Sequence, residues 1–138
     1  MKIKDVMTKS VETVRPDQTL QEAASKMKSL DVGPMPVTEN DRLVGMLTDR
    51  DIVVRAAAEG KDVRTTKVRD AMTAEVVCVA STRSIEDCMA LMTERRVRHL
   101  PVIENGQIIG LVSIGDLVKA TIDEQEFTIN QLKNYIAG

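Results

Sequence analysis

Two short stretches carry the residue types that could recognise a ligand in this chain. Asp51 follows Thr48 at a spacing of three residues, and Asp116 follows Ser113 at the same spacing. An ionised carboxylate only accepts hydrogen bonds, so one Asp can bind both hydroxyls of a ribose cis-diol, and a nearby hydroxyl can meet the sugar or a phosphate. The same spacing also predicts a helix cap, with Ser or Thr at the first position and an acidic residue in the first turn. The two interpretations are compatible, because a capping residue can also face a cleft.

These two stretches are copies of each other. Gly45 and Gly110 begin them at an offset of 65 residues, and the same offset aligns residues 3–55 with residues 68–120 without a gap. Fourteen of the 53 aligned pairs are identical, and a further eleven exchange one apolar residue for another. A gapless internal repeat of this length predicts two stacked copies of one supersecondary unit.

The first helix of each unit is predicted from its cap and its apolar spacing. Thr19 and Glu22 form a capping-box pattern. Apolar residues follow at the spacing of one helix face: Leu20, Ala23, Ala24 and Met27. Ser84 begins the matching pattern in the second unit. Each unit should therefore place one amphipathic helix on its sheet.

The strands and the second helix of each unit follow in a fixed order. A short extended segment around Val11 and Val14 precedes the first helix, and strands are expected over residues 35–38 and 43–47, joined by a hairpin turn. A second helix should then run over about residues 48–58, and its counterpart over about residues 113–122. We therefore predict a mixed α/β fold of the α+β class, made of two β-α-β-β-α units packed as a pseudo-twofold pair.

The repeat divides the chain into four parts. We expect repeat 1 over residues 1–60, a connector over residues 61–67, repeat 2 over residues 68–122 and a tail over residues 123–138. A unit this small buries too little surface to be stable alone, so the two units should bury their sheet faces against each other. The tail has an apolar side, which we expect to pack on the module or on a second subunit: Phe127, Ile129, Leu132, Tyr135 and Ile136.

Composition and charge exclude several classes of function. The 138 residues include one Tyr, one Phe and no Trp, and acidic and basic residues are interspersed at a net charge of −2. Nucleic acid is therefore not an expected partner. The chain begins without an apolar leader and has no run of 18 apolar residues, so we expect a cytoplasmic protein that does not bind membranes. Cys78 and Cys88 are predicted to be buried thiols, and with one His in the chain no metal site is expected.

Catalytic motifs are absent from the sequence. There is no Gly-x-Ser-x-Gly nucleophile elbow, no phosphate-binding Gly-Lys-Ser/Thr loop and no second His for a relay. We therefore expect a protein that is not an enzyme and requires no cofactor.

The motifs at matching places of the two repeats resemble those of a known family. Asp-x-Met-Thr opens both units, at Asp5 and at Asp70, and a Pro-Val pair enters each strand pair, at Pro36 and at Pro101. With the two Gly-to-Asp stretches, these residues make the chain similar, over residues 1 to about 122, to tandem pairs of CBS domains (Bateman modules), in particular to small stand-alone bacterial ones.

The resemblance implies a function and an assembly. CBS pairs hold adenosine nucleotides such as AMP, ADP or ATP in the cleft between the repeats, with the ribose on the residues that match Thr48, Asp51, Ser113 and Asp116. The chain would then be a regulatory sensor that signals its occupancy to an effector protein, and a homodimer. The alternative is a ligand-free interaction protein in which these residues only cap helices.

The two clefts are expected to differ in charge. The resemblance implies that Arg98 and His99 face the phosphates, whereas from the residues alone they could equally be the solvated end of a helix. Gly33 and Pro34 stand at the matching places of the first unit and carry no charge. The site that uses Arg98 and His99 should therefore take the more anionic ligand, and Arg50 could add a phosphate contact or remain in solvent.

The remaining candidate residues would line the clefts. Gly33 and Pro34 predict a rigid wall with few side-chain atoms, which suits a flat adenine. Four residues that lead into the units could offer backbone contacts to the base, or could simply close the edge of the core: Met7, Thr8, Met72 and Thr73.

Overall fold

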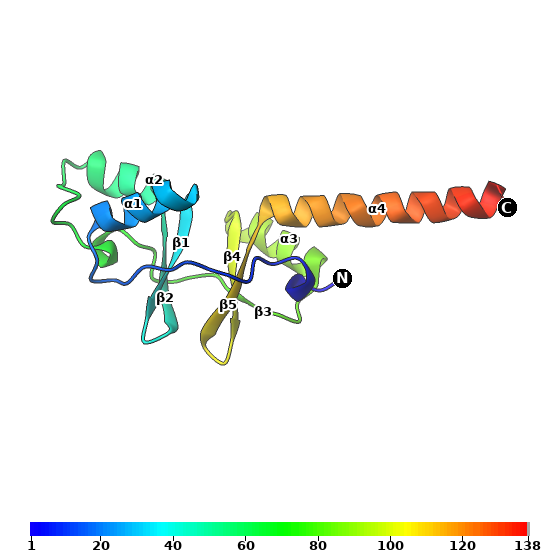
Figure 1. The fold of residues 1–138 in the computed structure, drawn as a ribbon, viewed down its shortest axis with the longest axis horizontal. Coiled ribbons are helices and arrows are strands. Elements are labelled where there is room, and N and C mark those ends of the chain that lie inside the picture. Colours follow the sequence, from blue (N-terminus) through cyan, green and yellow to red (C-terminus); the bar gives the residue numbers. More distant parts are fainter. Residues whose placement is uncertain (138) are drawn as a thin grey trace.

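The computed structural model describes residues 1–137 and contains both predicted repeats (Figure 1). Gly138, the last residue of the predicted tail, lies outside the described residues. The first repeat contains η1 (Ile3–Asp5), α1 (Leu20–Leu30), β1 (Pro34–Glu39), β2 (Arg42–Thr48), α2 (Asp49–Ile52) and the π-helical turn η2 (Val53–Ala57). The second repeat contains η3 (Val68–Asp70), β3 (Val79–Ala80), α3 (Ile85–Arg95), β4 (His99–Glu104), β5 (Gln107–Ser113) and α4 (Ile114–Ala137).

The strands form one five-stranded mixed sheet in the order β1-β2-β5-β4-β3. β1 and β2 form one antiparallel hairpin, β4 and β5 form the other, and β3 runs parallel to β4. In Figure 1 the helices α1, α2 and α4 lie at the upper ends of the strands, and the two hairpin turns project from the lower ends. The predicted α+β class and the order of the elements are confirmed. In the first repeat, however, the opening extended segment makes only an isolated bridge, from Val14 to Val37.

Each repeat keeps its own hydrophobic core, and the expectation that the sheet faces would be buried against each other is wrong. One buried cluster includes Leu20, Met35 and Leu47, and a separate cluster includes Ile85 and Leu100. The hairpins meet edge to edge instead, through one antiparallel pair between Arg42 of β2 and Gln107 of β5. The helices of each repeat pack on that repeat's own hairpin, as α1 does in the first cluster and α3 does in the second.

The segments that open the repeats are exchanged between them. Ile3 is fully buried in the core of the second repeat, whereas Val68 and Ala71 are buried in the core of the first. The backbone N–H of Ile3 donates to the carbonyl of Arg83 at 2.8 Å, which fixes the beginning of the chain on the second repeat. Each repeat therefore completes its core with residues from the other's opening segment, which explains how two small units share their stability.

The first helix of each repeat begins as its sequence predicts. The Thr19 hydroxyl accepts from the N–H of Glu22 at 3.1 Å, and the Ser84 hydroxyl accepts from the N–H of Asp87 at 3.0 Å. Asp31 and Arg96 end the two helices in the left-handed conformation, with φ of 54° and 56°. The reciprocal half of the first capping box does not form, because Glu22 instead accepts from the Gln18 amide at 3.2 Å.

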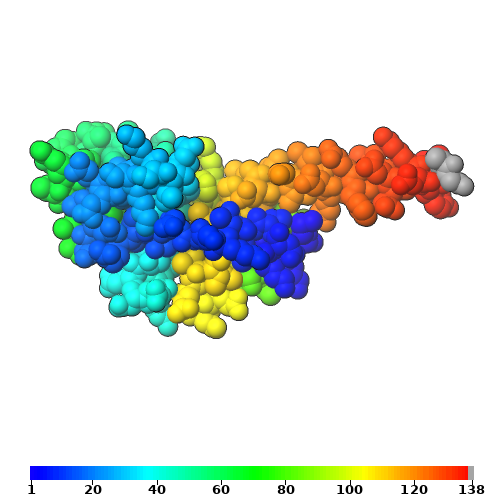
Figure 2. Space-filling model, viewed as in Figure 1, coloured from blue at the N-terminus to red at the C-terminus, as the bar shows by residue number. Residues whose placement is uncertain are grey.

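The last helix is longer than predicted. α4 has 24 residues and continues to Ala137, where the sequence analysis expected an end near residue 122. No Gly or Pro lies between residues 116 and 137, so nothing interrupts the helix. Its carboxyl-terminal half extends away from the body of the molecule (Figure 2), and every residue from 122 to 136 is exposed. The tail therefore does not pack on its own module.

The two thiols differ in burial. Cys88 is fully buried on α3, as predicted, but Cys78 is only partly buried, because it precedes the edge strand β3. Burial raises the pKa of both thiols above the ordinary value. Among the described helices, including the long α4, none is apolar over enough of its length to cross a membrane.

Candidate functional site

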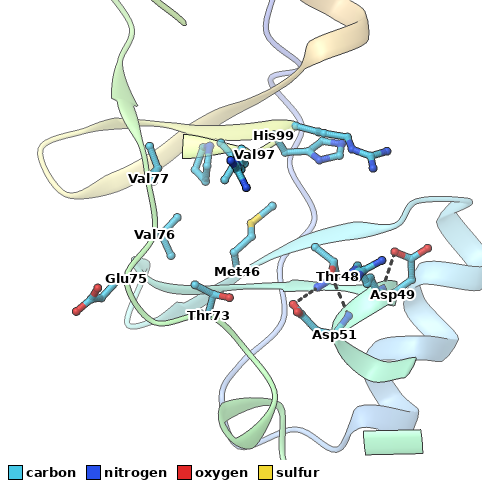
Figure 3. A pocket seen from close by; sticks show the side chains of 14 residues that line it. Met46, Thr48, Asp49, Asp51, Thr73, Glu75, Val76, Val77, Val97 and His99 are labelled. Carbon is cyan, nitrogen blue, oxygen red and sulfur yellow. Dashed lines mark hydrogen bonds between the residues drawn. The ribbon is translucent and has the colours of Figure 1, made fainter. Parts of the chain in front are cut away.

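A cavity of about 470 Å³ lies between the two repeats (Figure 3). The end of β2 and the start of α2 form one wall, and residues 96–99 at the start of β4 form the wall opposite. The segment after Thr73, which crosses from the first repeat to the second, closes a third side. The cavity is lined by Met46, Thr48, Asp49, Arg50, Asp51, Thr73, Glu75, Val76, Val77, Arg96, Val97, Arg98, His99 and Pro101.

Thr48 and Asp51 form the predicted helix cap at the wall of the cavity. The Thr48 hydroxyl accepts from the N–H of Asp51 at 3.1 Å, and Asp51 Oδ2 accepts from the N–H of Thr48 at 2.9 Å. Asp51 Oδ1 lies 3.9 Å from Arg55 Nε, and the side chain is 17% exposed. The cap therefore fixes the carboxylate in one orientation while part of its accepting capacity stays open.

His99 lies on the other side of the cavity from this cap (Figure 3), and Arg98, the residue before it, also lines the cavity. The carbonyl of Arg98 accepts from the N–H of Ile114 at 2.8 Å, which fixes the backbone at the start of β4. Arg98 is exposed, whereas His99 is partly buried. Burial lowers the pKa of His99 below the ordinary value, the Asp116 and Asp49 charges oppose that shift, and the Arg98 charge adds to it.

The cavity combines cationic groups with an apolar surface. Arg50 and Arg96 also line it, so three Arg residues line the same space as His99. The carboxylates of Asp49, Asp51 and Glu75 are present as well, and Asp49 Oδ1 accepts from the N–H of Arg50 at 2.9 Å. An apolar part is formed by Val76, Val77, Val97 and Pro101. The arrangement can receive a molecule that has an apolar ring, hydroxyls and negative charge.

Several of these residues were not identified from the sequence. Glu75, Val76 and Val77 belong to the crossing segment, and Arg96 is the residue that ends α3 in the left-handed conformation. The sequence did contain a signal close to each of them. Glu75, Val76 and Val77 follow the predicted site residue Thr73, and Arg96 directly follows the predicted helix α3. The sequence could not identify Glu75, Val76 and Val77, because the repeat does not show which unit the crossing segment packs against.

Four of the other predicted site residues do not line this cavity. Ser113 and Asp116 form the matching cap of α4. Asp116 Oδ2 accepts from the N–H of Ser113 at 2.9 Å, and the Ser113 hydroxyl accepts from the N–H of Asp116 at 3.1 Å. The carbonyl of Gly33 accepts from the N–H of Asp49 at 2.9 Å, and Pro34 begins β1. By the offset of the repeat, these four residues occupy the places that correspond to Thr48, Asp51, Arg98 and His99, in the pseudo-equivalent cleft.

The residues that open the repeats divide between the core and the clefts. Met7 packs against Gly110, Met72 packs against Gly45, and both Met side chains contact the cores. Thr8 forms a backbone bridge to Leu111, whereas Thr73 lines the cavity directly. In the described part of the chain, no group of three His, Cys, Asp or Glu residues is placed to hold a metal ion.

Comparisons with known proteins agree with this geometry. Residues 3–57 and 68–123 each match the family model of the CBS domain. The CBS domain-containing protein YhcV of Bacillus subtilis is 43% identical over 136 residues, which is 99% of this chain and 89% of that protein. The crystal structure of a CBS-domain protein from Agrobacterium tumefaciens, ATU1752, has a TM-score of 0.80 at 36% identity, covering 88% of this chain and 99% of that one.

A more distant structure shares the fold. The CBS domain pair of protein MJ0100 has a TM-score of 0.82 at 21% identity, covering 90% of this chain and 98% of that one. The duplicated sequence, the five-stranded sheet and the matched family model agree, and the chain belongs to the CBS domain family as a tandem pair of CBS domains.

Proposed function

We propose that this chain is a regulatory module that binds an adenosine nucleotide in the cavity between its repeats and signals its occupancy to an effector protein. One observation carries the proposal: the fold brings the Thr48 and Asp51 pair of the first repeat to the same cavity as Arg98 and His99 of the second. A nucleotide needs a carboxylate for its ribose and a cationic group for its phosphates. Asp51 and Arg98 are far apart in the sequence, but both line this cavity.

Each part of the cavity suits one part of a nucleotide. Asp51 has accepting capacity left for ribose hydroxyls, because the cap uses Oδ2 and leaves Oδ1 near the exposed Arg55. Guanidinium groups bind phosphate oxygens through two parallel hydrogen bonds, which Arg98, Arg96 or Arg50 can supply. The apolar surface of Val76 and Val77 suits a flat base. The protein MJ0100, which shares the fold, is described in complex with 5′-methylthioadenosine and S-adenosyl-L-methionine.

The pseudo-equivalent cleft has a different chemistry. At the places that match Arg98 and His99 it has Gly33 and Pro34, and at the place that matches Arg50 it has Gly115. Ser113 and Asp116 are retained as a cap. We propose that this cleft binds a less anionic adenosine compound or none, with Gly33, Pro34, Met7 and Thr8 at its wall.

A ligand in the cavity would contact both repeats and the segment that joins them. It can therefore favour one packing of the two repeats over another, by as much as its affinities for the two packings differ. No catalytic step is part of this proposal, and neither a cofactor nor a metal is required. A homodimer in the cytoplasm remains our expectation for the assembled protein.

Isothermal titration calorimetry with AMP, ADP, ATP and adenosine, on the full chain, tests the proposal. Asp51→Asn should weaken nucleotide binding by about ten- to a hundredfold, because a hydrogen bond to a charged group is lost. Asp116→Asn is the matched control, since Asp116 makes the same cap but does not line the cavity. Its charge acts on His99, so Asp116→Asn should change the affinity of this site, but much less than Asp51→Asn does.

Two results would contradict the proposal. If no adenosine compound at millimolar concentration binds or raises the melting temperature, the sensor function fails, because a ligand at a hundredfold over its Kd should add about 2.7 kcal/mol of stability. Equal nucleotide affinity in Asp51→Asn and wild-type protein would leave capping as the whole role of Asp51, and would favour the ligand-free interaction protein.

A further inference from the structure

The projecting helix α4 carries an apolar stripe that the rest of the chain does not cover. The stripe repeats at alternating steps of four and three residues, and its apolar members are 40% exposed or more: Val118, Ile122, Ile129, Leu132 and Ile136. Gln125 is the only polar residue within this series. Alternating steps of three and four define the a and d positions of a coiled coil.

The free half of α4 needs a partner to be stable. Residues 122–136 are all exposed and extend beyond the body of the molecule (Figure 2). An isolated helix of about 15 residues is only marginally stable in water, and most helices are stabilised by packing an apolar face. The stripe also begins at Val118 and Ile122, within the part of α4 that starts at the sheet. A partner helix can therefore follow α4 from the body to its end.

We propose that this stripe binds the same stripe of a second copy, so that two α4 helices form a parallel, in-register coiled coil. Ile122, Ile129 and Ile136 occupy the a positions, and Leu132 occupies a d position. β-Branched residues at a together with Leu at d favour two parallel strands. The proposal does not depend on nucleotide binding.

The charges beside the stripe favour this orientation. In a parallel pair, Glu126 and Lys133 flank one side of the seam and face the uncharged Thr121 and Thr128 of the other copy. An antiparallel pair that uses the whole stripe would set Glu126 against Glu126 of the other copy, and Lys119 against Lys133. Like charges at such contacts are destabilising.

Gln125, the polar residue of the stripe, gives a second reason to expect the parallel orientation. In the parallel, in-register pair Gln125 meets Gln125 of the other copy, and the two amides can hydrogen-bond to each other. In the antiparallel pair each Gln125 would face Ile129, and its amide would have no partner within the seam. A single polar residue in a seam is a known means of fixing register at some cost in stability.

Phe127 provides a matched control on the same helix. It is 65% exposed, but it is two residues from Ile129, which places it on the opposite side of α4. A surface that binds through the stripe does not use Phe127. Substitutions at Phe127 and at the stripe remove similar apolar groups from the same exposed helix, so their comparison isolates the seam.

Sedimentation equilibrium of the full chain tests the proposed contact. Wild-type protein should be dimeric at about 20 µM, and Leu132→Ser and Ile129→Ser should each raise the dimer Kd at least about tenfold. Phe127→Ser should leave it unchanged. A wild-type monomer at 100 µM would overturn the proposal and would show that the stripe serves a different partner. A dimer that resists both stripe substitutions, or that Phe127→Ser dissociates, would also overturn it.

Cysteine cross-linking tests the orientation. In the parallel pair Ile122→Cys should form a disulfide with its counterpart under mild oxidation, because equivalent a positions face each other. In the antiparallel pair the same Cys would face Leu132, ten residues or about 15 Å along the helix from its counterpart. Phe127→Cys controls for random collision. Absence of the Ile122→Cys cross-link in a dimeric sample, or cross-linking no faster than Phe127→Cys, would contradict the parallel arrangement.

Discussion

Thr73 and Met46 exchange both of their backbone hydrogen bonds, each N–H donating to the other's carbonyl at 2.9 Å. Thr73 opens the second repeat, whereas Met46 belongs to β2 of the first. Thr8 and Leu111 form the matching pair, at 2.9 and 3.0 Å. Each opening segment is therefore bound to the other repeat. Since Thr73 and Met46 both line the cavity, this exchange also builds one of its walls.

The close approach of these segments requires glycine in both strands. A Cβ on Gly45 would meet the Met72 side chain and lie 3.1 Å from the Thr73 carbonyl, and a Cβ on Gly110 would meet the corresponding groups of Met7 and Thr8. We expect Gly45→Ala and Gly110→Ala each to lower the free energy of unfolding by about 1–3 kcal/mol, because the packed segment must shift. Urea denaturation measures this change.

Gly115 is the control for this pair of substitutions. A Cβ there would have ordinary contact only, with the Ser113 hydroxyl at 3.6 Å, and the residue lies in a helix. Gly115→Ala should therefore leave stability unchanged or raise it by up to about 1 kcal/mol. If Gly45→Ala and Gly110→Ala both have the wild-type free energy of unfolding, the exchanged segments can shift to accept a Cβ without loss of stability, and the prediction is wrong.

Substitutions in the two caps can distinguish an effect on stability from an effect on nucleotide binding. Thr48→Ala and Ser113→Ala remove equivalent hydroxyls, which accept at 3.1 Å in both repeats, so each should lower the free energy of unfolding by about 1 kcal/mol. Only Thr48 lines the cavity, so only Thr48→Ala should also weaken nucleotide binding. Thermal denaturation with and without ATP measures both effects. Equal loss of ATP affinity in the two variants would mean that the effect comes from stability alone.

The charge of the ligand can be tested through Arg98. Arg98→Gln should weaken ATP binding by about tenfold or more and change adenosine binding little, because a charged hydrogen bond to phosphate is lost. Arg95→Gln removes an exposed guanidinium nearby on α3 that does not line the cavity, and should change neither affinity. Calorimetry at two salt concentrations would also show a weaker salt dependence for Arg98→Gln. If both ligands weaken equally, Arg98 does not contact the phosphates.

His99 predicts a change of stability with pH. Because burial lowers its pKa in the folded protein, the unfolded chain binds the proton more readily. The contribution of His99 to stability is therefore complete above the ordinary value of 6.5, and is lost as the pH falls from there through the folded pKa. Wild-type protein should lose more stability than His99→Gln between pH 7.5 and pH 5.5, measured by urea denaturation. An equal loss in both would show that other groups carry the pH dependence.

The repeat made most of the fold predictable. The caps at Thr48 and Ser113, the hairpin turns and the amphipathic first helices depend on residues within a few positions of one another, so the sequence pattern specifies them directly. The end of α4 was not predicted, because the apolar residues after Ile122 were interpreted as a packed tail. A helix with no Gly or Pro continues until something interrupts it, and nothing does before Ala137.

The lining of the cavity was predicted in part. Asp51, Thr48, Arg98 and His99 were identified from their types and their places in the repeat, but Glu75, Val76, Val77 and Arg96 were not. The sequence could not show that the cap of the first repeat and the cationic pair of the second share one cavity, whereas Ser113, Asp116, Gly33 and Pro34 lie elsewhere.

The sequence by itself determined the duplication, the order of the elements, the caps and the inequality between Arg98-His99 and Gly33-Pro34, because these are local patterns or comparisons of the chain with itself. Only the tertiary structure decided how the halves combine. Ile3 is buried in the second repeat and Val68 in the first, and the hairpins meet edge to edge. Such contacts join residues far apart in the chain, and they depend on which apolar surfaces each repeat leaves uncovered once its own helices have packed.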